Sequence, residues 1–482
     1  MPLLYQTMIT RELNSPISQT LPNGAALEFI VKLPNLAVTT IPATARTNIP
    51  PKEWITVDFH HPHQIVAPAF TRVLAWHEGQ LKLVSICQLT PGMRVAFMTK
   101  FDPPCLCSEL HIPQSILDVG IGEPIQLRPL LALDRASGQT FGAVYGDGWP
   151  GNYPYEVGLF LANKHECVAS AFLSGVMALA IPQCGAPGDI AHVQMRSRPM
   201  ISPHGSTIQR FVRSSNLNEL TRYMLGHLAN CKRVPVFALL APHSFRTGFI
   251  EGLLGTDGSV AFTRTKSEIS HSKEWNVSLS TTSPHGALGI HNLLCSVGLA
   301  NTVTQCSQSQ DHAILFLINI RHADIADWQG SIIRVDRQAR LSEIQTQYSA
   351  VKRGSVIATP ELYPHLLPFA QFAGIHRATL HKATHHWGAM ERDIRDRIVQ
   401  VIPARLLEGS PRLANWVNAT AHENLRWLQV QRVENGIATA TLAIARSRRL
   451  GPDHMQLVPM NLEWPVSNEI FLASNGAMLS GV

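Results

Sequence analysis

Two short glycine-patterned segments constrain this chain more than any other feature of its sequence. In the second of them, Gly248, Gly252 and Gly255 recur at helical spacing on one face of a helix expected over residues 243–256. Each glycine inside a helix costs about 1 kcal/mol relative to alanine, so a compensating interaction is required. A face without side chains lets the axis of a second helix approach closely. The pattern therefore predicts a tightly packed helix pair.

An upstream segment that ends at Asp147 repeats this layout. When it is aligned with the segment that ends at Asp257, two pairs of glycines fall into register. The pairs are Gly138 with Gly248 and Gly142 with Gly252. We expect Gly258, directly after Asp257, to end its helix with a positive φ. Packing along the glycines brings both carboxylates to one end of the pair, where the helix dipoles are already negative. Divalent cations relieve such repulsion, so the spacing predicts a metal site.

These two segments resemble the paired motifs of the LAGLIDADG homing endonucleases. Ile250-Glu-Gly-Leu-Leu-Gly-Thr-Asp-Gly258 is a close match and Thr140-Phe-Gly-Ala-Val-Tyr-Gly-Asp-Gly148 a looser one. The linker at 232–237 is similar to the segment that precedes the second motif in that family. A single Gly-Asp-Gly usually marks a turn, but two motifs in register are much more specific.

Residues 126–330 divide into two halves of similar order, 126–231 and 232–330. Their patterns predict an αββαββα unit in each half. An antiparallel sheet with helices on one face leaves the other face open. In the family, the two open faces straddle a DNA duplex, although a merely solvated face is an equal alternative for any single residue. The candidate DNA-binding residues are Lys232, Arg233, Arg264 and Lys266.

The resemblance implies phosphodiester hydrolysis with Mg²⁺ or Mn²⁺ as the cofactor. Asp147 and Asp257 are then the catalytic residues and act as metal ligands, together with the positions before them, Gly146 and Thr256. The metal supplies an activated water and stabilises the leaving oxygen.

Two basic residues occupy matching positions late in the halves, Arg213 and Arg321, and are candidates to polarise water or phosphate. The implied partner is double-stranded DNA with a long recognition site, bound through phosphates and read through base edges. Because both halves lie in one chain, we expect a monomer without an obligate protein partner.

Both ends of the chain resemble the Hint fold of inteins. Residues 1–125 and 425–482 contain short strands separated by turns, so the fold class is α+β, with the two LAGLIDADG halves inserted in an all-β domain. The positions of the splicing residues are degenerate. They are Ser15 for the nucleophile, His61 or His63 for the splicing histidine, and Ser480 and Gly481 for the closing His-Asn pair.

Asparagine cyclisation needs a side-chain amide, so we expect a chain that no longer splices. This layout is similar to that of the intein-derived mating-type-switching endonucleases. The segment 331–424 between the halves and the closing strands is helical, and residues 331–450 carry about twice as many basic as acidic residues. The segment 331–424 either extends the contact surface with DNA or is a solvated helical linker.

Composition says more about the cellular compartment of the protein than about its activity. The longest apolar run, near 168–181, is too short to span a membrane, and the eight scattered cysteines favour an intracellular protein with reduced thiols. The 22 histidines show no convincing metal-ligand spacing, and we expect His376 and His381, or His385 and His386, to decorate helix faces. A net charge of +6 permits a nucleic-acid partner without requiring one.

Two alternative functions remain open from the sequence. One is a self-processing intein that retains N-terminal cleavage at Ser15. The other is a maturase-like LAGLIDADG protein that binds DNA or RNA and has lost cleavage. The presence of both Asp147 and Asp257 argues against the second alternative.

Overall fold

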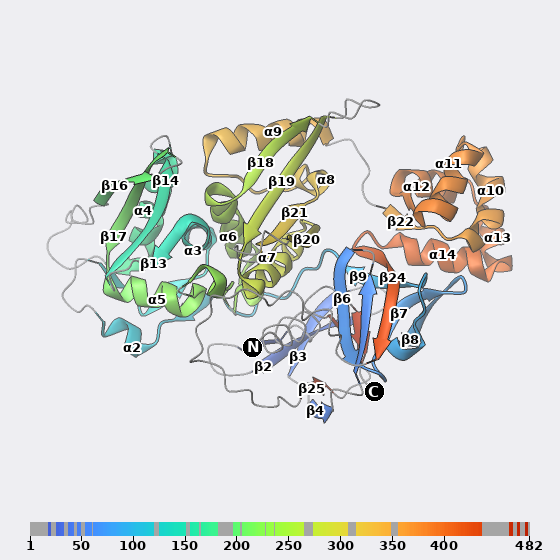
Figure 1. Cartoon of the computed structure of the whole chain (residues 1–482), viewed down its shortest axis with the longest axis horizontal. Coiled ribbons are helices and arrows are strands. Elements are labelled where there is room, and N and C mark those ends of the chain that lie inside the picture. The colour runs from blue at the N-terminus through green and yellow to red at the C-terminus, as the bar shows by residue number, and fades with distance from the viewer. Residues whose placement is uncertain are drawn as a thin grey trace. The chain divides into compact units, whose positions relative to one another are not determined.

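The fold is taken from a computed structural model of the whole chain (Figure 1). It describes residues 54–59, 61–119, 125–150, 155–162, 165–181, 196–202, 205–226, 228–235, 237–264, 273–306, 315–348 and 355–435, and short strands at 18–20, 26–32, 37–42, 46–49, 462–465, 470–472 and 478–480. The chain forms two compact units. One contains 102–349 with 19–27, and the other contains 1–18, 28–101 and 350–482.

The first half of the unit 102–349 is built around a four-stranded antiparallel sheet of order β13-β14-β17-β16. Its helix α3 begins with a capping box, in which Asp134 and Ser137 satisfy each other's backbone N–H. Its elements are α3 (Arg135–Asp147), β13 (Gly148–Pro150), β14 (Glu156–Ala162), α4 (Glu166–Leu179), β15 (Ala180–Ile181), β16 (Arg196–Ser202), β17 (Gly205–Arg213) and α5 (Ser215–Leu225).

The second half repeats this arrangement with an antiparallel sheet of order β18-β19-β21-β20. In both sheets the strands stand in the order first, second, fourth, third, so the repeated αββαββα order predicted from the sequence is present. The elements are α6 (His243–Thr256), β18 (Ser259–Arg264), β19 (Lys273–Thr281), α7 (Pro284–Ser296), β20 (Asn301–Cys306), β21 (Leu315–Ile320), α8 (His322–Ile325) and α9 (Val335–Tyr348).

Short elements precede and join the halves. They are β10 (Glu109–His111), α2 (Gln114–Leu117), β11 (Gln126–Leu127), β12 (Leu130–Ala132), η4 (Ala229–Cys231) and η5 (Ala238–Leu240). Strand β10 pairs with β12, and β11 pairs with β15. The helix α9 belongs to this unit and packs beside α8 and β18.

In the other unit, strands from distant parts of the chain share one sheet. The strand β24 (Leu425–Asn435) pairs with β5 (Trp54–Phe59) on one side and β9 (Arg94–Met98) on the other. The sheet continues through β6 (His61–Pro68), β7 (Arg72–His77), β8 (Gln80–Ser85), β26 (Ile470–Leu472) and β27 (Met478–Ser480). Both ends of the chain therefore build this sheet, and its assignment as a Hint domain stays a prediction.

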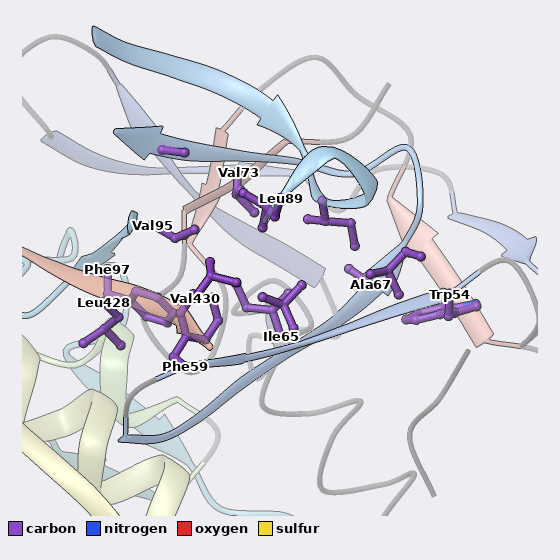
Figure 2. Packing of buried hydrophobic residues seen from close by; sticks show 14 residues of the cluster. Trp54, Phe59, Ile65, Ala67, Val73, Leu89, Val95, Phe97, Leu428 and Val430 are labelled. Atoms are coloured by element: carbon purple, nitrogen blue, oxygen red, sulfur yellow. The ribbon is translucent and has the colours of Figure 1, made fainter. Parts of the chain in front are cut away.

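Buried side chains hold that sheet together (Figure 2). Val430 of β24 lies in one cluster with Phe59, Ile65 and Val95 of the N-terminal strands, and all four are at most 5% exposed. The rings of Phe59 and Phe97 meet edge to face at 5.1 Å. Because burial of apolar area is the main stabilising term, residues beyond 424 are needed to complete the core begun by 54–97.

Residues 355–421 of this unit are mainly helical. Trp416 is fully buried, and its indole N–H donates to the carbonyl oxygen of Ile357 at 2.8 Å. The elements are β22 (Ser355–Ile357), η6 (Pro360–Leu362), α10 (Tyr363–Phe372), α11 (Arg377–His381), the π-helix η7 (Lys382–Trp387), β23 (Ala389–Glu391), α12 (Arg392–Gln400), α13 (Ala404–Gly409) and α14 (Pro411–Ala421).

Several predicted positions lie outside the described residues, namely Ser15, Lys266 and Gly481. For His61 and His63 in β6, Arg264 in β18 and Ser480 in β27, the backbone is described but the side chain is not. Within the described part of the chain, no helix is long and apolar enough to cross a membrane.

Candidate active site

The helices α3 and α6 pack backbone to backbone through the predicted glycines. A Cβ atom on Gly142 would overlap the carbonyl oxygen of Phe249, and one on Gly252 would overlap that of Gln139. The remaining two glycines, which overlap the partner helix in the same way, are Gly138 and Gly248. The close approach that offsets the helix cost of glycine is therefore present at four positions.

Two details of the glycine prediction are wrong. Gly255 does not face α3, because the nearest atom to a Cβ placed there is Cβ of Ile333, 3.7 Å away. Gly258 does not take a positive φ. A Cβ on Gly258 would lie 2.7 Å from both the Cα and the carbonyl oxygen of Leu254. Lack of space against the helix end, rather than left-handed backbone, requires glycine at this position.

A buried carboxylate fixes the helix pair near its other end. Glu251 of α6 is fully buried and accepts hydrogen bonds from Arg135 Nε at 2.8 Å and Gln139 Nε2 at 2.7 Å, both on α3. Arg135 Nη2 also donates to this carboxylate, and the backbone N–H of Ser331 adds a further bond at 2.6 Å. A buried charge is tolerated only when it is paired and hydrogen-bonded, and these donors meet that condition.

The packing brings the C-terminal ends of α3 and α6 together. Asp147 is the last residue of α3, and Asp257 is the residue that caps α6. A Cβ placed on Gly146 would lie 3.1 Å from Cβ of Asp257. The two predicted acidic residues therefore lie at one end of the helix pair, as the spacing predicted.

A cation caps the end of α3. Lys232, from the linker between the halves, donates from Nζ to the carbonyl oxygens of Gly146, at 2.8 Å, and Tyr145. Its Nζ also lies 5.6 Å from the centre of the Tyr145 ring. The last carbonyls of a helix lack partners within the helix and carry its negative pole, so the ammonium group satisfies both needs.

A second cation caps the end of α6 in the corresponding way. Arg337 of α9 donates from Nη1 to the carbonyl oxygens of Leu254 at 2.7 Å, Gly255 at 3.0 Å and Thr256 at 2.9 Å. When the two motifs are aligned on their aspartates, Gly255 and Thr256 match the two carbonyls that Lys232 contacts. The pseudo-symmetry of the helices thus extends to the charges at their ends.

The cations at the C-terminal ends of α3 and α6 do not fully compensate the negative charge there. Burial, followed by the negative charge of Asp257, raises the pKa of Asp147 to about 6, although Arg337 and Lys232 oppose the shift. The pKa of Asp257 is also raised, mainly by withdrawal of its carboxyl group from water, even though the residue as a whole keeps an exposed face. Burial lowers the pKa of Lys232. A further cation would relieve the strain on both carboxylates.

The basic residues named from the sequence are engaged elsewhere. Arg213 lies 3.9 Å from Glu156 and over the ring of Tyr155, whereas Arg321 makes two 2.8 Å bonds to Asp324. The charges that act on Asp147 and Asp257 are those of Lys232, Arg337 and Arg334. Their catalytic roles stay proposals.

Arg233 donates to the carbonyl oxygen of Tyr223 at 2.6 Å, so its guanidinium is held against α5. Sequence reasoning named Lys232 for DNA contact and missed Arg337 altogether. The available signal was a basic series at helical spacing, in which Arg334 directly precedes α9 and Arg337 and Arg340 lie on it. Arg340 donates to the carbonyl oxygen of Val260 at 2.7 Å.

The residues at the helix ends fit a hard divalent cation. Two carboxylates and the neighbouring carbonyl oxygens of Gly146 and Thr256 form an all-oxygen donor set, which suits Mg²⁺ or Mn²⁺. In the described residues, no group of three His, Cys, Asp or Glu side chains converges on one point. Backbone carbonyls, water or substrate oxygens would complete the coordination.

No protein-family model matches this chain, and no curated protein matches it. Solved structures to which it is similar include I-DmoI in complex with DNA and Mn, at 14% identity and a TM-score of 0.28, over 45% of this chain and 99% of that one. The homing endonuclease I-WcaI bound to its DNA recognition sequence matches at 11% identity and a TM-score of 0.28, over 50% of this chain and 94% of that one. At such scores, function has to be argued from the residues of the chain itself.

The glycine contact yields a stability prediction with a matched control. Gly252→Ala should lower the free energy of unfolding by roughly 1–3 kcal/mol, because the added methyl group overlaps the backbone of α3. Gly255→Ala should leave it unchanged or raise it by up to about 1 kcal/mol, because the added methyl group would only make ordinary contact with Ile333 and alanine favours a helix. Urea unfolding of both variants measures this. Equal effects would contradict the packing.

The raised pKa of Asp147 predicts a pH-dependent stability in EDTA. A carboxyl group that titrates near pH 6 in the folded state, against an ordinary 3.8, favours folding below pH 4 and loses that contribution as the pH rises through 6. Asp147→Asn should therefore be more stable than the wild type above pH 6, by on the order of 1–3 kcal/mol, and equal to it at pH 4. Urea unfolding between pH 4 and 8 tests this, and a difference that is constant with pH would refute it.

Proposed function

We propose that this protein is a site-specific DNA endonuclease that cuts both strands with Mg²⁺ or Mn²⁺. The observation that carries the proposal is the pair of aspartates, Asp147 and Asp257, at adjoining helix ends, each flanked by a cation bound to the helix carbonyls. The packing of two helices does not require two crowded carboxylates with raised pKa values. A site that binds a metal ion and a phosphate does require such carboxylates.

The sheet of the second half offers a polar surface suited to nucleic acid. Ser259, Asn319 and Thr302 lie in one row across its strands and are at least partly exposed, whereas Ser278, which completes the row on β19, is only 7% exposed. The neighbouring row is apolar, with Val260, Val277 and Ile320 buried. Hydroxyl and amide groups can both donate and accept, which is what contacts to base edges require. The uncharged row is therefore a candidate for sequence reading, with affinity supplied by basic residues at the margins.

Each group at the helix ends has a definite role in this proposal. Asp147 and Asp257 would hold the ion, which when bound polarises phosphate and lowers the pKa of water. Lys232 and Arg337 oppose the rise in the pKa of both carboxylates and raise the local positive potential for an anionic substrate. The pairing of the helices fixes the spacing of the two acids, so that two strands are addressed by one chain.

One observation favours a second candidate, a DNA-binding protein that has lost cleavage. The carbonyl oxygens of Gly146 and Thr256 already accept hydrogen bonds from Lys232 and Arg337. If these bonds persist on DNA, fewer oxygens are left to the metal. Cleavage before Ser15, the remaining alternative, concerns residues outside the described ones.

Cleavage of plasmid DNA that carries the uninterrupted insertion locus of the gene decides between these functions. We expect linearisation with Mg²⁺ or Mn²⁺ and none with EDTA. Asp257→Asn should reduce the rate by at least about 100-fold, since it removes a metal ligand. Glu343→Gln, which removes an exposed carboxylate on α9, serves as the matched control and should cut normally. Salt-sensitive binding without cutting would support the DNA-binding alternative, and cutting by Asp257→Asn at the normal rate would exclude this site.

The two capping cations should matter for cleavage beyond their effect on folding. Lys232→Met and Arg337→Met should each slow cleavage by about 10-fold or more at saturating metal, because the local positive potential is lost. Arg321→Met, which disturbs an ion pair with Asp324, should have a smaller effect. Single-turnover rates and urea unfolding separate catalysis from stability. Normal rates in both Lys232→Met and Arg337→Met would contradict the assigned roles.

A further inference from the structure

A pair of histidines occupies the surface of the helical part of the unit that contains 355–435. His381 ends α11, and His385 lies in the π-helix η7 that follows directly. Their rings are parallel within 6°, with centroids 4.2 Å apart. Both residues are exposed. A π-helical turn is rare and frequently marks a functional position.

Neighbouring side chains hold the two rings in this arrangement. Tyr363 of α10 meets both edge to face, with centroids at 5.6 Å from His381 and 5.2 Å from His385. The hydroxyl of Tyr363 accepts a hydrogen bond from Arg377 Nε at 3.0 Å. Tyr363 is thus anchored through its hydroxyl group, and its ring packs against both imidazoles.

The hydroxyl group of Thr384 contacts His385. Thr384 is buried, and its hydroxyl oxygen lies 3.0 Å from the carbonyl oxygen of Leu380 and 2.8 Å from Nδ1 of His385. In the tautomer in which Nδ1 donates to this oxygen and the hydroxyl donates to Leu380, Nε2 of His385 carries a free lone pair. A hydroxyl or carbonyl group bound to the second ring nitrogen is the arrangement that orients metal-binding histidines.

Metal binding requires neutral imidazoles, which is the ordinary form of histidine above about pH 7. The segment 363–388 contains no Asp or Glu, so no carboxylate of its own competes for a cation.

We propose that His381 and His385 form a surface site for a borderline transition-metal dication such as Zn²⁺ or Ni²⁺. Two histidines four residues apart lie on adjacent turns of one face. Their in-plane lone pairs meet at one ion once both rings turn out of the parallel stack. Because no three ligating side chains converge within the described residues, water completes the coordination. The ion would tie α11 to the π-helix. Mg²⁺, which prefers oxygen, would not compete.

Isothermal titration of the full chain with Zn²⁺ and with Ni²⁺, each in excess Mg²⁺, tests this site. We expect one binding event that His381→Asn and His385→Asn each weaken at least 10-fold, because either change removes half of the protein ligands. Thr384→Val should weaken it by about 10-fold, since it removes the group that orients His385. His365→Asn removes a histidine of α10 outside the pair and should bind as the wild type does.

Far-UV circular dichroism verifies that each variant is folded, which the exposure of both histidines makes the expected result. Unchanged binding in either His381→Asn or His385→Asn would overturn the paired site. An equal loss in His365→Asn would show adventitious binding to surface histidines and would overturn it as well. The site is independent of DNA cleavage, so these outcomes do not depend on the endonuclease.

Discussion

The backbone contact between α3 and α6 is the interaction on which the rest of the unit 102–349 depends. Four glycines allow carbonyl oxygens of one helix to reach the space that a side chain of the other would fill. Such contact fixes the axial register as well as the distance, because a shift by one residue would place a Cβ against backbone. The position of both helix ends, and hence of Asp147 and Asp257, follows from this register.

That register creates an electrostatic problem that other parts of the chain resolve. Two negative helix poles and two carboxylates meet at one end, where Lys232 and Arg337 each bind the last carbonyls of one helix. The cations come from different places, a linker and a later helix, yet take equivalent positions. They reduce the repulsion without removing it, since the pKa values of both aspartates remain raised. A partly compensated site is suited to an exchangeable cation.

The two candidate ion sites differ in chemistry as well as place. The helix ends offer carboxylate and carbonyl oxygens, which favour hard cations. His381 and His385 offer imidazole nitrogens, oriented by Thr384 and Tyr363, which favour zinc and its neighbours. The two proposed sites therefore differ in the class of ion that their donor atoms favour.

The sequence predicted those features that local patterns encode. The bounds of α6, the repeated order of both halves and the pairing of Asp147 with Asp257 all follow from periodicity and internal repetition. Local patterns gave the wrong reason for glycine at position 258. Its φ is not positive, and glycine is required because Leu254, in the last turn of α6, leaves no space for a side chain. Patterns also singled out Arg321, which is paired with Asp324.

By itself, the sequence determined that two glycine-faced helices must pack and that their acidic ends must meet, since helical spacing and the cost of glycine leave few alternatives. Only the tertiary structure decided which cations stand beside those acids. Lys232 lies 86 residues from Gly146, and Arg337 lies 81 residues from Thr256, which are the nearest of their carbonyl partners along the sequence. Contacts between residues so far apart in the sequence depend on how whole helices and strands pack, and local periodicity does not predict that packing. The stacking of His381 on His385 was likewise settled by a π-helical turn and by Tyr363, contributed from another helix.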